Sequence, residues 1–252
     1  MTDNVQVLVD LIIENEKIVY FTGAGVSTAA DIPDFRSADG LYNQVTGHFN
    51  QPPEYMLSKD CLANHPQAFY QFQWQYMYHP DIEPSLAHEF PVRLEELGKQ
   101  VTVVTQNADG LHQRAGSSRV MALHGNQYDF YCCRCGRHYI YQELDLSDKK
   151  IPYCPYDQGL VRSTAVLFGE GLDGDTLKGA VSAIQAADLL IIAGTSLQVA
   201  PANQLINYFH GQKTVVINQQ RLGQSRSDEL FIQADIEETL QPVLAILEAN
   251  QD

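Results

Sequence analysis

Apolar residues along this chain follow two patterns. Near the start they recur at helical spacing, as in Val5, Leu8, Val9 and Ile12, which predicts an amphipathic helix over residues 3–15. Farther along, short uninterrupted apolar runs predict strands that are buried on both faces. These runs cover residues 18–21, 101–104, 120–123, 165–168, 189–193 and 214–217.

Helical segments separate most of these runs. Proline inside a helix removes a hydrogen bond, so Pro91 should kink or divide the segment that contains it. Residues 38–52 are polar and contain glycine, which predicts a loop. Strands that alternate with helices predict an α/β fold, in which helices cover both faces of a parallel sheet. The predicted helices cover residues 53–78, 84–97 and 174–187, a segment from Pro201 and a last segment from Asp235.

Two insertions interrupt this alternation. The remaining segments, residues 1–42, 84–127 and 164–252, are expected to form one large Rossmann-like domain. Residues 43–83 are helical and aromatic, and residues 128–163 contain most of the cysteines. We expect these two insertions to fold together as a smaller lobe, with a helical module and a zinc-ribbon-like module.

A glycine-containing segment follows the first predicted strand. Gly23 and Gly25 permit a tight turn and close approach of a ligand, and backbone N–H groups at a helix start attract phosphate. Residues 33–36 then place a rigid turn, an acid, an aromatic ring and a cation together, as in a reactive-site loop. Two glycines after a strand can also be a plain turn, and Thr28 replaces the third glycine of the dinucleotide fingerprint.

Polar residues follow the other predicted strands as well. The carboxyl ends of parallel strands meet at one edge of a sheet, where ligands bind. Groups from distant parts of the chain therefore converge on one rim, which favours a nucleotide site. They are Gly23, Gln106, Asn107, Asp109, His124, Gly169, Glu170, Gly194, Thr195, Ser196 and Asn218.

Four of the five cysteines lie between residues 132 and 154. Cys132, Cys135, Cys154 and Asp157 follow the spacing of a zinc ribbon, with a carboxylate as the fourth ligand. Cys133 and His138 are alternative fourth ligands, and a site that no longer binds metal is the remaining possibility. Since all ligands would come from the protein, the zinc would be structural.

Composition narrows the class of partner. The chain has 252 residues and a formal net charge of −15, which disfavours direct nucleic-acid binding and suits a basic partner such as a lysine-rich peptide. No apolar run reaches membrane-spanning length, and no secretory leader is recognisable. We therefore expect a cytoplasmic protein that does not bind membranes.

In their order, the motifs of this chain resemble those of the sirtuins, NAD-dependent protein deacylases, and most closely the bacterial and archaeal type. The resemblance covers essentially the whole chain from Gly23 onward. The matching blocks are Gly23–Ser27, Ile32–Ser37, Thr105–Asn107, Asp109–His112, Ala115–Gly116, Leu123–Gly125, Phe168–Glu170, Gly194–Leu197 and Val216–Asn218.

The resemblance implies NAD as cosubstrate and acyl-lysine proteins or peptides as substrates. It implies that the acylated peptide adds as a strand between two segments of the protein. The implied peptide-binding residues are Val166, Phe168, Gly169, Glu170, Leu197 and Val199. The implied NAD-binding residues are Gly23, Ala24, Gly25, Phe35, Arg36, Gln106, Asn107, Asp109, Gly194, Thr195, Ser196, Asn218, Asp235 and Ile236.

The resemblance also implies the chemistry. The acyl oxygen attacks C1′ of the nicotinamide ribose, nicotinamide leaves, and His124 acts as general base on the ribose hydroxyls. Asn107 is the second implied catalytic residue. The products would be nicotinamide, O-acyl-ADP-ribose and free lysine, and a monomer is expected.

Some positions depart from the family pattern. Ala108 replaces an isoleucine, so we expect weaker inhibition by nicotinamide. Asp31 replaces a glycine, and aspartate tolerates positive φ better than most residues do. Ser163 replaces a proline. Sirtuins that remove acidic acyl groups carry Tyr-x-x-Arg, whereas this chain has Tyr70 and Gln73, so acetyl or longer apolar acyl groups are expected rather than succinyl.

Two other functions are compatible with an NAD cleft. One is a mono-ADP-ribosyltransferase or NAD hydrolase on the same fold, which would need neither His124 nor the peptide-binding segments. The other is a non-catalytic NAD-sensing module, which would bind NAD without releasing nicotinamide. The presence of Phe35, Asn107, Asp109 and His124 favours deacylation over both.

Overall fold

The computed structural model describes residues 2–35, 40–45, 51–144, 146, 150–221 and 229–250. A parallel six-stranded sheet forms its centre, in the order β3-β2-β1-β7-β8-β9. The strands are β1 (Lys17–Thr22), β2 (Gln100–Thr105), β3 (Val120–Ala122), β7 (Leu189–Ala193), β8 (Lys213–Ile217) and β9 (Glu229–Ile232).

The strand order has one reversal, and it lies between β1 and β7. From β1 the chain adds strands on one side, through β2 to β3, and then returns to add β7, β8 and β9 on the other. This is the order of a Rossmann fold, in which ligands bind where the order reverses. Thr22 pairs with both Thr105 and Ala193, so the carboxyl ends of β1, β2 and β7 lie side by side.

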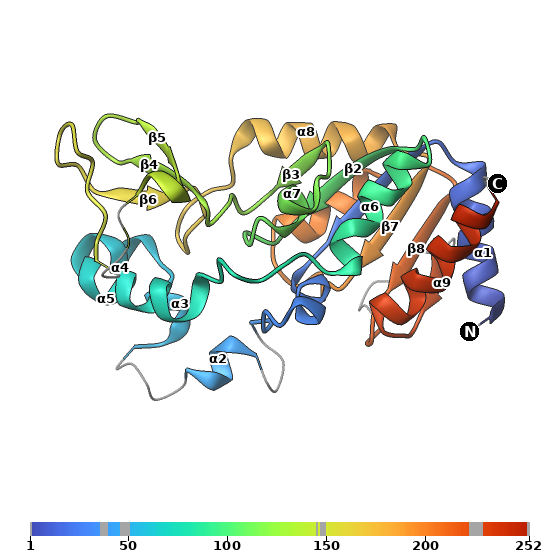
Figure 1. Cartoon of the computed structure of the whole chain (residues 1–252), viewed down its shortest axis with the longest axis horizontal. Coiled ribbons are helices and arrows are strands. Elements are labelled where there is room, and N and C mark those ends of the chain that lie inside the picture. The colour runs from blue at the N-terminus through green and yellow to red at the C-terminus, as the bar shows by residue number, and fades with distance from the viewer. Residues whose placement is uncertain are drawn as a thin grey trace.

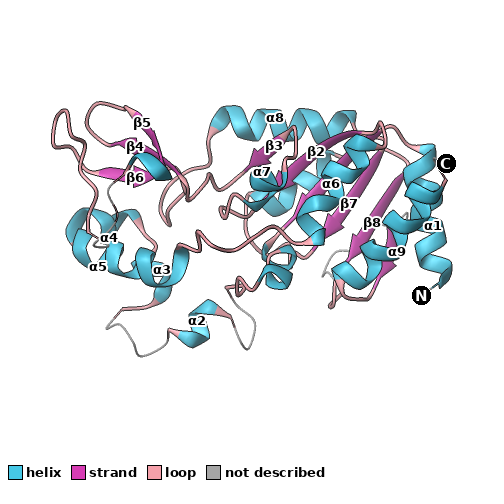
Figure 2. Ribbon diagram, in the orientation of Figure 1, coloured by secondary structure: helices cyan, strands magenta, loops and turns pink. Residues whose placement is uncertain are grey.

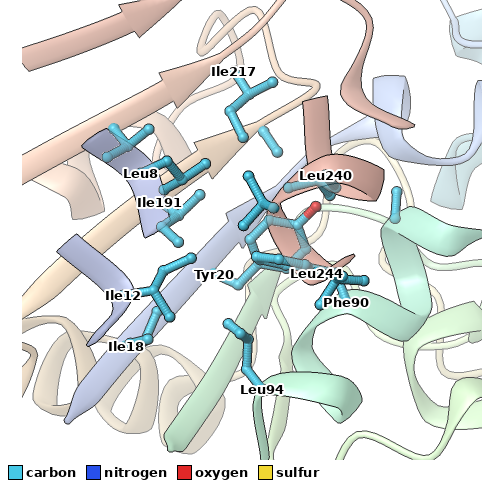
Figure 3. Close-up of a cluster of buried hydrophobic side chains, with 14 of the residues drawn as sticks. Leu8, Ile12, Ile18, Tyr20, Phe90, Leu94, Ile191, Ile217, Leu240 and Leu244 are labelled. Carbon is cyan, nitrogen blue, oxygen red and sulfur yellow. The ribbon is translucent and has the colours of Figure 1, made fainter. Parts of the chain in front are cut away.

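Helices cover both faces of the sheet, as the alternation of elements predicts (Figures 1 and 2). One face packs against α1, α6 and α9, and Figure 3 shows Tyr20 of β1 buried among Leu8, Phe90 and Leu240 from these helices. The other face packs against α8 and η5. These elements are α1 (Thr2–Glu14), α6 (Leu86–Glu96), α8 (Gly174–Ala186), α9 (Ile236–Ala249) and the 3-10 helix η5 (Ala202–Tyr208).

A smaller lobe lies at the left of Figure 1, where a three-stranded antiparallel sheet packs near short helices. Two buried clusters stabilise it, one around Phe69, Phe72 and Leu167 and one around Phe130 and Cys154. Its elements are α3 (Pro53–Met56), α4 (Lys59–Asn64), α5 (Pro66–Phe72), the π-helical turn η3 (Gln73–Met77), β4 (Asp129–Cys132), β5 (His138–Ile140), the 3-10 turn η4 (Tyr141–Glu143) and β6 (Val161–Ser163).

Several predicted elements are wrong. Residues 165–168 do not form a strand of the main sheet, because β7 occupies the place beside β1, and only Phe168 forms a bridge, to Ser58. The single helix expected over residues 53–78 is several short ones, since Ser58 caps α4 and a new helix begins at Pro66. The helix predicted from Pro201 is present, but it is a 3-10 helix rather than an α-helix.

Helix α6 continues through Pro91, which does not divide it. The proline is one of the buried residues of this helix. Two further short helices, α2 (Leu41–Gln44) and α7 (Leu111–Ala115), and strand β9 have no counterpart in the predicted elements. Among the described residues, no helix combines the length and apolar composition needed to cross a membrane.

Candidate active site and metal cluster

A cleft of about 1260 Å³ runs along the carboxyl ends of the central strands and continues onto the smaller lobe. It brings together nearly all the residues that the motifs predict for NAD and peptide binding, including His124 and Asn107. Two are exceptions. Leu197 does not line the cleft but packs against the core beneath α8, and Arg36 lies outside the described residues.

The glycine loop after β1 touches the loop after β7 backbone to backbone. Gly25 N–H donates to the Gly194 carbonyl at 2.7 Å, and a Cβ on Gly25 would lie 2.7 Å from Gly194 Cα. A Cβ on Gly23 would lie equally close to Thr195 Cβ. Both glycines are therefore required by the close approach of two loops, and the glycine loop lines the cleft where a phosphate could lie.

The glycine loop does not lead into a long helix. It forms two 3-10 turns, η1 (Ala24–Val26) and η2 (Thr28–Ala30), and then an irregular segment. Asp31 ends the second turn with φ 61°, in the left-handed region that favours glycine. This left-handed residue redirects the chain toward Phe35, which lines the cleft and contacts Tyr42 edge-on.

Asn107, Ser27 and Asp109 form a hydrogen-bonded group between the glycine loop and the loop after β2. Asn107 Nδ2 donates to the Gly23 carbonyl at 3.0 Å and to Ser27 Oγ at 2.9 Å. Ser27 Oγ in turn donates to Asp109 Oδ2 at 2.7 Å. Both polar side chains of the expected nicotinamide site are thus fixed before any ligand binds.

Two buried histidines support this group from behind. His88 Nε2 lies 3.3 Å from Ser27 Oγ, and His112 Nε2 lies 3.1 Å from Thr22 Oγ1. Their rings are 4.9 Å apart. Burial lowers the pKa of His88, and burial together with the neighbouring His88 lowers the pKa of His112 to about 3. Both imidazoles are therefore neutral at pH 7.

His124 follows β3 and faces the cleft. Its Nδ1 lies 2.6 Å from the Gln106 carbonyl oxygen, which can only accept a hydrogen bond. Nδ1 therefore carries the proton of the neutral ring, and Nε2 remains unprotonated and able to accept one. Gly125 has φ 71°, and a Cβ there would overlap the Thr164 carbonyl, so glycine is required directly after this histidine.

The segment after β6 connects the smaller lobe to the cleft. Val166 N–H donates to the His124 carbonyl, and Phe168 pairs with the backbone of Leu57 and Lys59. Arg162 is buried and forms a two-pronged ion pair with Glu170, whose carboxylate also accepts from Leu167 N–H. Glu170 lines the cleft, but its oxygens hold this segment in place.

The end of the cleft beside the loops after β7 and β8 is polar. Thr195 Oγ1 accepts from Gln106 Nε2 at 2.9 Å, and Asn218 Nδ2 donates to the Thr195 carbonyl. Asp235 caps α9 by accepting from Glu237 and Glu238 N–H groups. The first two bonds connect the loops that follow β2, β7 and β8, and the start of α9 lines the same cleft.

Some residues in or behind the cleft have no individual role predicted from the motifs. Ser27 lies within a matching block, and its spacing from Gly23 is the only sequence signal for its role. His88 lies in a helix that carries no predicted site residue. Of the two residues matched to the Tyr-x-x-Arg positions, only Gln73 lines the cleft. Tyr70 donates a hydrogen bond to the Val161 carbonyl and faces a separate groove.

The four predicted metal ligands come together in the smaller lobe. The ligand atoms of Cys132, Cys135, Cys154 and Asp157 all lie within 4.8 Å of one another. Two matching turns present them. Gly136 N–H donates to the Cys132 carbonyl, and Gln158 N–H donates to the Cys154 carbonyl. Gly136 and Gln158 both have positive φ, at 71° and 60°.

The spacing within this cluster fits a tetrahedral zinc ion. Zn–S bonds of about 2.3 Å imply sulfur atoms about 3.8 Å apart, and Cys135 and Cys154 Sγ are 3.9 Å apart. Asp157 Oδ1 lies 3.4 Å from Cys132 Sγ, so the carboxylate takes the place of a fourth thiolate. Cys133 and His138 are exposed and lie outside the cluster, so neither supplies the fourth ligand. The cluster can hold a structural zinc ion.

Comparisons with known proteins agree with the fold. The Sir2 family profile matches residues 23–201. An NAD-dependent protein deacetylase of Clostridium acetobutylicum is 41% identical over 244 residues, which are 97% of this chain and 99% of that protein.

Solved structures give the same result. A Sir2 protein with a deacetylated p53 peptide and 3′-O-acetyl-ADP-ribose superimposes with a TM-score of 0.83 at 33% identity, over 96% of this chain and 98% of that one. A complex of Sir2 with a p53 peptide and NAD⁺ gives a TM-score of 0.81 at 34% identity, over 98% and 99%. The chain therefore belongs to the Sir2 family.

Proposed function

We propose that this protein is an NAD-dependent protein-lysine deacetylase, which transfers the acyl group of a modified lysine to ADP-ribose and releases nicotinamide. The observation that carries the proposal is the state of His124. Its Nδ1 is bonded to the Gln106 carbonyl, and its Nε2 is left as a base in the same cleft as Asn107 and Asp109. Family membership supplies the reaction class.

The residues of the cleft have distinct roles in this reaction. NAD, when bound, supplies the ribose carbon to which the acyl oxygen becomes bonded as nicotinamide leaves. His124 Nε2 accepts a proton from a ribose hydroxyl, and the hydrogen bond at Nδ1 fixes the ring and stabilises the positive charge that this proton creates. Asn107 and Asp109, already fixed by Ser27, orient the nicotinamide and its ribose.

We also propose how the remaining predicted residues share the two ligands. Gly23, Ala24 and Gly25 are assigned to the pyrophosphate, and Gly194 to Ser196 to the phosphate and adenosine side. Asn218, Asp235 and Ile236 are assigned to the adenosine, Phe35 to the nicotinamide end, and Arg36 to the phosphate and ribose channel. Val166, Phe168, Gly169 and Val199 are assigned to the peptide backbone. Apart from Arg36, which is outside the described residues, their common place along one cleft supports this assignment.

The two-lobe division is part of this proposal. Residues 1–42, 84–127 and 164–252 would form the NAD-binding domain, and residues 43–83 and 128–163 the lobe that holds zinc. Separate buried clusters in the two lobes support the division. We propose a cytoplasmic monomer that acts on acyl-lysine peptides rather than nucleic acid, in keeping with its net charge of −15.

The direct test is to incubate the protein with NAD and an acetyl-lysine peptide and to identify products by mass spectrometry. Deacetylated peptide, nicotinamide and O-acetyl-ADP-ribose in equal amounts are expected. ADP-ribosylated protein or free ADP-ribose as the main product would indicate a transferase or hydrolase instead. NAD binding without nicotinamide release would indicate a non-catalytic module.

Substitution of the base sharpens this test. His124→Ala should lower kcat by roughly 100- to 10,000-fold, because a general base contributes about that much. His210→Ala, at an exposed histidine outside the cleft, is the matched control and should keep full activity. A His124→Ala protein that works at the native rate would disprove the assignment of the base.

A further inference from the structure

Two buried glutamines of the cleft wall, Gln73 and Gln127, each have a side-chain oxygen without a hydrogen-bond partner among the described residues. Gln73 is only 4% exposed, and it lines the cleft. Its Oε1 is buried without a hydrogen-bond partner among the described residues. Buried amides are nearly always hydrogen-bonded, so an unpaired one beside a cleft indicates that a ligand completes it.

The backbone at this position is unusual as well. Helix α5 ends at Phe72, and the chain continues as the π-helical turn η3, in which Tyr78 N–H donates to the Gln73 carbonyl. Such turns are rare and occur frequently at functional sites. The turn places Gln73, Tyr76 and Met77 along the same wall of the cleft.

Apolar side chains of the smaller lobe share the cleft wall with Gln73. Leu41, Leu57 and Leu167 line this part of the cleft and belong to the buried cluster of the smaller lobe, as Met77 does in part. Arg221 is the one lysine or arginine among the described cleft residues, and it follows β8 on the large domain. An acyl carboxylate beside Gln73 would therefore meet an amide but no described cation.

We propose that Gln73 selects acyl groups that carry an uncharged hydroxyl, as in hydroxybutyryl-lysine. The proposal rests on the deacylase function above and adds the substrate class. An amide offers both a donor and an acceptor, and a hydroxyl can satisfy either one. The leucines and Met77 accommodate the carbon chain, and the hydroxyl completes the hydrogen bonding of the buried amide. A plain butyryl chain leaves that amide unpaired.

The test compares peptides of one sequence that carry acetyl-, butyryl-, 3-hydroxybutyryl- or 4-hydroxybutyryl-lysine. At least one hydroxybutyryl peptide should have a kcat/KM about 3- to 10-fold above that of the butyryl peptide, the effect of one neutral hydrogen bond. Gln73→Leu and Gln73→Met should abolish this preference and raise turnover of the butyryl peptide. Gln71→Leu, at an exposed glutamine of α5 outside the cleft, should leave the preference unchanged.

The outcomes separate two failures. No turnover of any peptide, acetyl-lysine included, would contradict the deacylase function itself. Turnover of the acetyl peptide without a hydroxyl preference, or with a preference that survives Gln73→Leu, would overturn only the role of Gln73. Melting temperatures show whether both variants fold, and they should not fall, because the substitution removes an unpaired polar group from an apolar wall.

Discussion

The two ends of the cleft are built in different ways. At the cofactor end, Asn107, Ser27 and Asp109 are bonded to one another, and the glycine loop is in backbone contact with Gly194. At the proposed acyl end, the buried Oε1 of Gln73 has no hydrogen-bond partner among the described residues, and Gln73 lies on a π-helical turn. One end is complete before ligand binds, and the other is completed by the ligand.

This difference matches what each end has to do. A cosubstrate with one invariant structure is best served by groups that are fixed in advance, because no reorganisation is then needed during the reaction. An acyl group varies in length and polarity, and flexible side chains such as Met77 adapt to it. Substitutions at the cofactor end should therefore reduce stability and activity, whereas those at the acyl end should redirect specificity.

The largest effect is expected where the two loops of the large domain touch. Gly25→Ala would place a methyl group 2.7 Å from Gly194 Cα, and backbone on both sides prevents relief. Overpacking of this kind costs about 1–3 kcal/mol, so the free energy of unfolding should fall and NAD affinity should fall with it. Calorimetry of unfolding and NAD titration measure both.

Gly174→Ala is the matched control, because a Cβ there meets no atom within 4 Å and the residue opens α8. It should leave both properties nearly unchanged. If Gly25→Ala were equally harmless, the description of the cofactor end as rigid would be wrong.

The buried His112 predicts a pH dependence of stability. Its pKa is about 3 in the folded protein, against about 6.5 for an unfolded chain. Below pH 6.5 the unfolded state therefore binds a proton that the native state cannot, so this residue lowers stability as pH falls toward 3. Between pH 7 and pH 5 the loss is about 2 kcal/mol.

Denaturation of the wild type and of His112→Gln at several pH values measures this contribution. The wild type should lose more stability than the variant over that interval, whatever the variant's own stability at pH 7. Parallel curves for the two proteins would show that His112 is protonated in the native state or hydrated.

The smallest of these effects concerns the predicted zinc cluster in the smaller lobe. The protein should contain about one zinc ion per chain by elemental analysis. Asp157→Cys should retain zinc longer against a chelator, because thiolates are the softer ligands that zinc prefers. Asp157→Ala should lose it most readily, while NAD binding at the cofactor end persists. Equal zinc retention by all three proteins would show that Asp157 is not a ligand.

Much of the architecture follows from local patterns. The uninterrupted apolar run at residues 189–193 forms a strand, because both faces of a central strand are buried. The helical spacing of apolar residues around Leu8 forms α1, because only one face of that helix is buried. The strand predicted over residues 165–168 is wrong, because an apolar run shows burial and not the partner against which it packs. Ala165 and Leu167 are buried, but the segment does not pair within the main sheet.

The sequence by itself determined the parallel α/β fold, the cysteine and aspartate cluster, and the polar residues that collect at the strand ends, because each depends on residue type and spacing. Only the tertiary structure decided which neighbours those residues meet. It placed His88 behind Ser27, joined Arg162 to Glu170, turned Tyr70 away from the cleft and left Gln73 facing it unpaired. These contacts join segments far apart in the chain, and no local pattern encodes such distances.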